Sequence, residues 1–197
     1  IHLTNPLFFP GSGQIKWESV FAIPTLSVSG DAFATMVGLS NGFTAVPYQS
    51  DVTFIYNPAK TFTCSGAVTN GSANVSSVGS CSGVIDATSI QGTMAISGTN
   101  IAGGATVSSV NAGAGTMVMS ANATGTGTVT ITFTAGNFLM AHAGKPGSES
   151  YQITNTAAVA GTYYRTGAIM NAAGTSTSYY LNGSIVATIT TTLPPAG

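Results

Sequence analysis

Turn-forming residues interrupt every stretch of this 197-residue chain, and no window of about 11 residues keeps the apolar spacing of an amphipathic helix. Short segments rich in β-branched and aromatic residues stand between the turns, at 19–23, 35–39, 51–56, 128–133, 176–181 and 184–189. The last two flank Asn182 and Gly183, the pair that best supplies the two positive φ angles of a type I′ hairpin turn. Many short strands with regular turns predict an all-β sandwich.

Charged side chains make up only 5% of the chain, against about 25% in ordinary soluble domains. Four cations cannot neutralise a run of phosphates or form a polybasic membrane patch, so we expect no nucleic-acid partner. No apolar run approaches the roughly 18 residues of a membrane-spanning helix, so we expect no membrane insertion. A nearly neutral surface also lacks charge repulsion between copies, which favours assembly.

The composition changes sharply along the chain. Between residues 61 and 135 the only charged residue is Asp86 and the only aromatic residues are Phe62 and Phe133, whereas the flanks hold the single Trp and all seven Tyr. We therefore predict a discontinuous sandwich built from residues 12–60 and 136–197, with a small Gly/Ser/Thr-rich β module inserted at 61–135. Insertion at a hairpin tip costs little loop entropy. Residues 1–11 form an N-terminal arm in this organisation.

Two cysteines, Cys64 and Cys81, fall inside the predicted insert. A disulfide between them would close a loop of about 17 residues, worth about 3 kcal/mol in the chain-entropy model. The alternative is two free thiols in a reducing compartment.

The sequence contains no recognisable motif of catalytic residues. His142 stands alone on a strand-like run, where a histidine is more often structural or superficial than catalytic, and no nucleophile motif accompanies it. The only two glutamates, Glu18 and Glu149, lie in no glycosidase-like motif and are interpreted as solvated or loop acids. Asp31 with Asn41, or Asp51, could contribute to a calcium site, but no calcium-binding loop motif is present. We therefore predict no enzyme activity, no cofactor and no metal.

Aromatic side chains are the candidates for a carbohydrate-binding platform. Side chains alternate along a strand, so one member of each tyrosine pair, 163–164 and 179–180, must face the core and the other the opposite side. The alternative is that these aromatic residues are core, as they more often are in sandwiches. The candidate ligand-binding residues, with an arginine that could pair with a carboxylate or stack on a ring, are Trp17, Tyr48, Tyr151, Tyr163, Tyr179 and Arg165.

Four Asn-x-Ser/Thr triplets are possible N-glycosylation sites in a secreted eukaryotic or archaeal protein. A Ser/Thr-rich chain also produces such triplets by chance. They begin at Asn70, Asn74, Asn122 and Asn182.

The flanks resemble the concanavalin-A-like (laminin-G-like) jelly-roll domains of tailed-phage structural proteins. The resemblance is clearest at residues 160–165 (AGTYYR) and 171–188 (NAAGTSTSYYLNGSIVAT), which match the family's Gly-Thr-Trp/Tyr-Tyr strand and its following hairpin. It extends to residues 17–26, 32–41 and 50–56, and the segment 90–133 is similar to a small β module of phage virion proteins. Family members carry further strands after the position of residue 195, so we expect the N-terminal arm or a neighbouring subunit to supply a missing edge strand.

This resemblance implies a structural virion protein of a tailed phage, a fibre, spike or decoration module that serves in assembly and in attachment to a host surface or glycan. Its expected partners are further copies of itself, other virion proteins and a cell-surface glycan, and its expected location is the virion or the extracellular space. One alternative is the subunit of an extracellular pilus-like or thread-like filament that polymerises by strand exchange. Another is a secreted carbohydrate-binding module.

Overall fold

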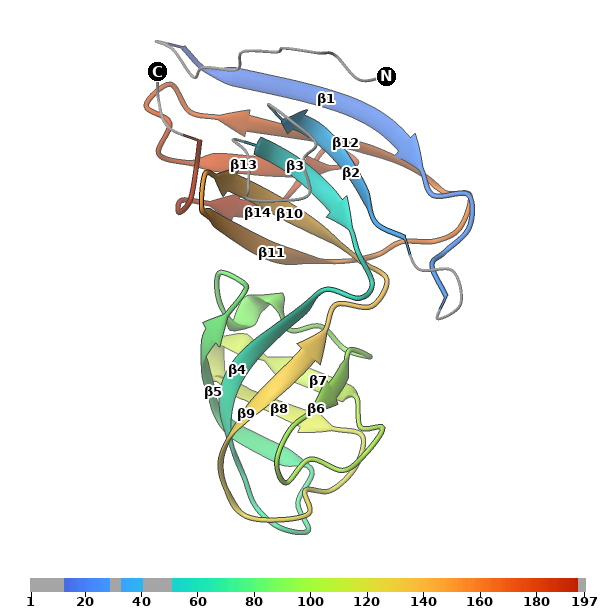
Figure 1. Ribbon diagram of the computed structural model, residues 1–197, viewed down its shortest axis with the longest axis vertical. Helices are drawn as coiled ribbons and strands as arrows, with labels where there is room; N and C mark the ends of the chain where they lie inside the picture. Colours follow the sequence, from blue (N-terminus) through green and yellow to red (C-terminus); the bar gives the residue numbers. More distant parts are fainter. Residues whose placement is uncertain (1–12, 29–32, 41–50, 195–197) are drawn as a thin grey trace. The chain divides into compact units, whose positions relative to one another are not determined.

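The computed structural model describes residues 13–28, 33–40 and 51–194, and these residues form antiparallel strands and turns with no α-helix among them. The prediction of an all-β protein is therefore confirmed. The chain divides into two compact units (Figure 1). Unit 1 takes in Ile1–Tyr56 and Leu139–Gly197, and unit 2 is the intervening stretch Asn57–Phe138.

Unit 1 contains two four-stranded sheets whose strands come from both ends of the chain. The first sheet has the order β1 (Ile15–Ala22), β12 (Tyr163–Met170), β13 (Thr177–Leu181) and β14 (Ser184–Ile189). The second sheet has the order β11 (Ser148–Ala157), β10 (Phe138–Lys145), β3 (Asp51–Tyr56) and β2 (Thr35–Ser40). In the first sheet β1 pairs with β12, so strands about 150 residues apart in sequence lie side by side, with Ile15 opposite Met170 and Ala22 opposite Tyr163.

Aromatic rings from both sheets of unit 1 meet in its core. Phe54 of β3 lies edge-on to Trp17 of β1 and to Tyr179 of β13, with ring centroids 6.4 and 5.6 Å apart. Tyr179 also donates a hydrogen bond from its hydroxyl to the carbonyl oxygen of His142, at 2.6 Å, which ties the first sheet to β10. Burial of these large apolar side chains is the main source of the unit's stability.

The hairpin between β13 and β14 turns at Asn182 and Gly183, whose φ angles are 50° and 88°. Both φ angles are positive, as the sequence predicts for a type I′ turn. Asn182 also fastens the turn to the neighbouring strand, because its backbone N–H donates to the carbonyl of Arg165 and its side-chain Oδ1 accepts from the Arg165 N–H. The turn is therefore held in place beside β12.

Unit 2 is built on a six-stranded sheet with short 3-10 turns at Ala87–Ser89 and Ala112–Ala114. The sheet has the order β6 (Ala95–Ser97), β9 (Gly127–Thr134), β4 (Thr61–Val68), β5 (Asn74–Ser82), β8 (Thr116–Met119) and β7 (Val107–Asn111). Pairing of β4 with β5 is irregular, and β5 carries positive φ angles at Ser77 and Ser80. Such bulges bend a strand and increase its twist.

The core of unit 2 combines one aromatic pair with small and medium side chains. Phe62 and Phe133, the only two aromatic residues between positions 61 and 135, stack with ring centroids 5.0 Å apart. Cys64 and Cys81 are joined by a disulfide between the adjacent strands β4 and β5. Among the described residues, no helix is long and apolar enough to span a membrane.

Candidate ligand-binding groove

A shallow groove of about 190 Å³ lies on the solvent-facing side of the first sheet of unit 1. Its floor is Gly167, which stands opposite Glu18 of β1 and opposite Tyr180 of β13 in the strand register. A Cβ atom at position 167 would lie 2.7 Å from the backbone oxygen of Trp17, so no larger residue fits without a shift of the strands. The missing side chain leaves the hollow between the neighbouring rows of side chains.

An ion pair forms one wall of the groove. Arg165 Nε lies 2.6 Å from Glu18 Oε1, and Arg165 Nη2 lies 3.0 Å from Glu18 Oε2, so the guanidinium donates two hydrogen bonds to the carboxylate. Both side chains are largely exposed, at 62% and 44%. Pairing with Arg165 lowers the pKa of Glu18, and the same contact raises the pKa of Arg165. Solvent screening makes such a pair a weak contributor to stability, so its clearest effect is to fix the shape of this wall.

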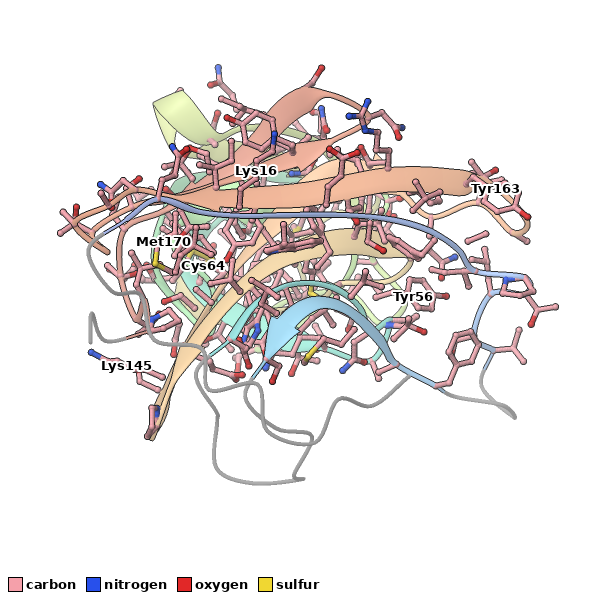
Figure 2. The ribbon with its side chains drawn as sticks, turned by 90° about the horizontal axis from the view of Figure 1, so that it is seen from above. Lys16, Tyr56, Cys64, Lys145, Tyr163 and Met170 are labelled. Atoms are coloured by element: carbon pink, nitrogen blue, oxygen red, sulfur yellow. A yellow bond between two sulfur atoms is a disulfide. The ribbon has the colours of Figure 1, made fainter. Side chains whose placement is uncertain are left out.

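The remaining lining gives the groove a cation and a ring. Lys16 is exposed and lies on β1 two residues before Glu18. Tyr180 is partly exposed and lies on the other side of Gly167 from Glu18. Ile169, which is opposite Lys16 in the strand register, also lines the groove. Figure 2 shows Lys16 and Tyr163 towards opposite ends of this sheet. Polar donors, one ring and apolar surface around a concave floor are the usual elements of a small-ligand site.

The candidate ligand-binding residues predicted from the sequence lie in different places in the structure. Arg165 lines the groove, and Tyr163 is 75% exposed at the end of β12, outside the groove. Trp17, Tyr151 and Tyr179 are core residues, so they offer no exposed platform, and the alternative interpretation as core aromatics applies to them. Trp17 nevertheless borders the groove, since its backbone oxygen lies under Gly167. The candidate Tyr48 lies outside the described residues, as do residues 1–11, Asp31 and Asn41. Among the described residues, no cluster of three metal-ligating side chains is present.

The alternation argument correctly predicts one core and one outward residue in each tyrosine pair. Tyr164 is 3% exposed against 75% for Tyr163. In the second pair Tyr179 is fully buried, so the residue that reaches the groove is Tyr180, which is not among the candidates predicted from the sequence. Alternation along β13 is unbroken, with Thr177, Tyr179 and Leu181 buried, because the bulge beside this pair places its extra residue, Val186, on β14. A count along the strand from apolar Leu181 is therefore the signal that could have identified Tyr180.

A second polar cluster lies on β3, β10 and β11 of unit 1. His142 Nδ1 lies 2.8 Å from Asp51 Oδ1 and 3.2 Å from Thr53 Oγ1, and His142 Nε2 lies 3.5 Å from Glu149 Oε2. Asp51 Oδ1 forms no hydrogen bond despite this short distance, so the contact is electrostatic, between two buried groups. Tyr151 packs on the imidazole with ring centroids 4.5 Å apart and donates a hydrogen bond to Glu149.

This cluster corrects the interpretation of Glu149 as a solvated acid, because its side chain is only 16% exposed and faces the histidine. Burial lowers the pKa of His142, but the carboxylates of Asp51 and Glu149 outweigh burial and raise the pKa above its ordinary value. Burial, with the nearby Asp51 charge, holds the pKa of Tyr179 well above its ordinary value, so its hydroxyl stays protonated. The histidine is 2% exposed, which makes this cluster structural in character.

Comparison of the chain with protein-family models, with curated proteins and with solved structures finds no match. The groove and the buried cluster therefore have to be interpreted from their own chemistry.

Proposed function

We propose that this chain is a structural protein of a tailed-phage virion that serves in assembly and in attachment to a host-surface glycan. In this proposal unit 1 is a concanavalin-A-like jelly roll and unit 2 is an inserted module. Support comes from the sequence resemblance at residues 160–165 and 171–188, which fall on β12, on β13, on β14 and on the turn between the latter two strands. The two antiparallel sheets of unit 1 are compatible with that family.

The observation that carries the attachment role is the groove over Gly167. Its lining residues come from β1, β12 and β13 and from the turn before β14, so a rigid sheet positions them. At about 190 Å³ it is smaller than the roughly 300–1,000 Å³ of a typical small-molecule cavity, so it suits one terminal unit of a larger ligand. We propose a binding role without catalysis, since the lining residues include no nucleophile beside a base.

A filament subunit remains the second candidate, and the sheet order favours it. Within the described residues, β1 has a hydrogen-bonded neighbour on one side only, β12. Such an edge can accept a strand from another copy.

Two measurements on the full chain test these proposals. Light scattering gives the solution mass with and without residues 1–11, and a microarray of bacterial surface polysaccharides reports binding. The virion proposal predicts a closed oligomer that survives the truncation, together with glycan binding. Open-ended polymers that become monomers after truncation would replace it with the filament, and a saccharide-binding monomer would replace it with a secreted binding module.

A further inference from the structure

Positive charge is concentrated in the groove. The whole chain has only four lysines and arginines, and two of them, Lys16 and Arg165, line this one hollow. Glu18 is the only acid in the lining, and Arg165 already holds both of its oxygens. Among the described residues Lys16 forms no salt bridge, so the groove keeps one uncompensated positive charge.

Donors remain available beside that charge. A guanidinium carries five N–H groups, and Glu18 takes one from Nε and one from Nη2, which leaves three of five for a ligand. The Tyr180 ring stands across the floor and supplies an aromatic surface with a polar hydroxyl tip. A pyranose ring presents apolar C–H faces and hydroxyl edges, which match a tyrosine ring and free N–H donors.

From these contacts we infer that the groove takes an acidic saccharide unit, a sugar ring that carries a carboxylate, with the ring against Tyr180 and the carboxylate at Lys16. The inference deepens the attachment function proposed above and rests on it. A single carboxylate matches the single uncompensated charge. A polymer with a phosphate in every repeat needs a track of cations, which a chain with four cations does not supply.

The test measures binding of the full chain to tetragalacturonate and to its methyl ester by isothermal titration calorimetry. The two probes have the same rings and differ at the carboxyl groups, which are charged in the acid and are neutral, with an added methyl group, in the ester. We expect the acid to bind about tenfold or more tightly than the ester, since one charged contact is worth about that much. We also expect its affinity to fall as sodium chloride is raised. Sialyllactose and lactose form a second matched pair with a different acidic sugar.

Matched variants locate the site. Lys16→Met keeps the aliphatic stem and should erase the preference for acid over ester, whereas Lys145→Met removes an exposed lysine from the second sheet of the same unit and should change nothing. Tyr180→Ala should weaken binding of every saccharide that binds, whereas Tyr163→Ala removes an exposed tyrosine of the same sheet outside the groove and should leave binding intact. Circular dichroism melts confirm that each variant is folded.

The outcomes separate this inference from the proposed function. Equal binding of acid and ester that still depends on Tyr180 would keep the attachment role and overturn the acidic ligand. Binding of polyglycerol phosphate but of no carboxylate sugar would also overturn it. Failure of the wild-type chain to bind any saccharide, on the microarray or in solution, would remove both.

Discussion

Gly167 of β12 and Trp17 of β1 approach so closely that a Cβ atom on the glycine would lie 2.7 Å from the tryptophan's backbone oxygen. Gly167 has no side chain and stands between Glu18 and Tyr180 on the outer face of the sheet. The same position therefore brings two strands together and opens the groove above them.

Gly167→Ala should destabilise the protein by about 1–3 kcal/mol, the usual cost of forcing extra volume into a packed site. The atom in the way is the backbone oxygen of Trp17, which cannot rotate away as a side chain can. Urea denaturation measures the change. Gly13→Ala is the control in the same unit, because a Cβ there meets nothing within 4 Å. Equal stability of the two variants would show that β1 and β12 separate easily.

Stability should depend on the protonation of His142. Its folded-state pKa is raised above the ordinary 6.5, so the protonated form is favoured by folding. The stability that it contributes is fully present below about pH 6.5 and is lost as the pH rises through the higher folded value. Denaturation free energies measured from pH 5.5 to 9 should decline for the wild type, and His142→Gln should flatten this decline. A wild-type profile that matched that of the variant would contradict this account.

Loss of the Cys64–Cys81 disulfide should lower the stability of unit 2 by about 3 kcal/mol, because the bond closes a loop of 17 residues. The comparison is a Cys64→Ala, Cys81→Ala double variant against the oxidised wild type, followed by hydrogen exchange on β4 and β5. Exchange in β12 and β13 of unit 1 serves as the internal reference. Mass spectrometry after alkylation without reductant should find no labelled cysteine in the wild type, and labelling of both would show that the bond is absent.

Removal of the negative charge from the groove should sharpen its preference for anions. Glu18→Gln leaves Arg165 without its carboxylate and gives the groove two uncompensated cations. We expect tighter binding of tetragalacturonate with a steeper salt dependence, and little change in thermal midpoint because the pair is solvent-exposed. Weaker binding would mean that Glu18 itself contacts the ligand.

Local sequence patterns predicted much of the secondary structure, since alternation and turn residues act over a few residues. The segment 51–56 and the segment 184–189 are strands with the predicted bounds, and the Asn182 turn has the expected backbone. The cluster around His142 could not be predicted in the same way. Asp51 and His142 are 91 positions apart (142 − 51) and meet only because β3 pairs with β10, with Thr53 opposite His142. The groove likewise depends on the pairing of β1 with β12.

Unit 2 begins and ends on neighbouring strands. Thr61 at the start of β4 pairs with Thr134 at the end of β9, and the Lys60 carbonyl accepts a hydrogen bond from the Ala135 N–H just outside that pair. The two ends of the unit are thus fastened to each other by its own sheet. Tyr56 and Leu139, just outside the stretch, are likewise opposite each other in the pairing of β3 with β10, so a short glycine bridge from residue 57 to residue 138 could replace the whole stretch. Replacement of unit 2 should therefore leave the strand pairing within unit 1 unchanged.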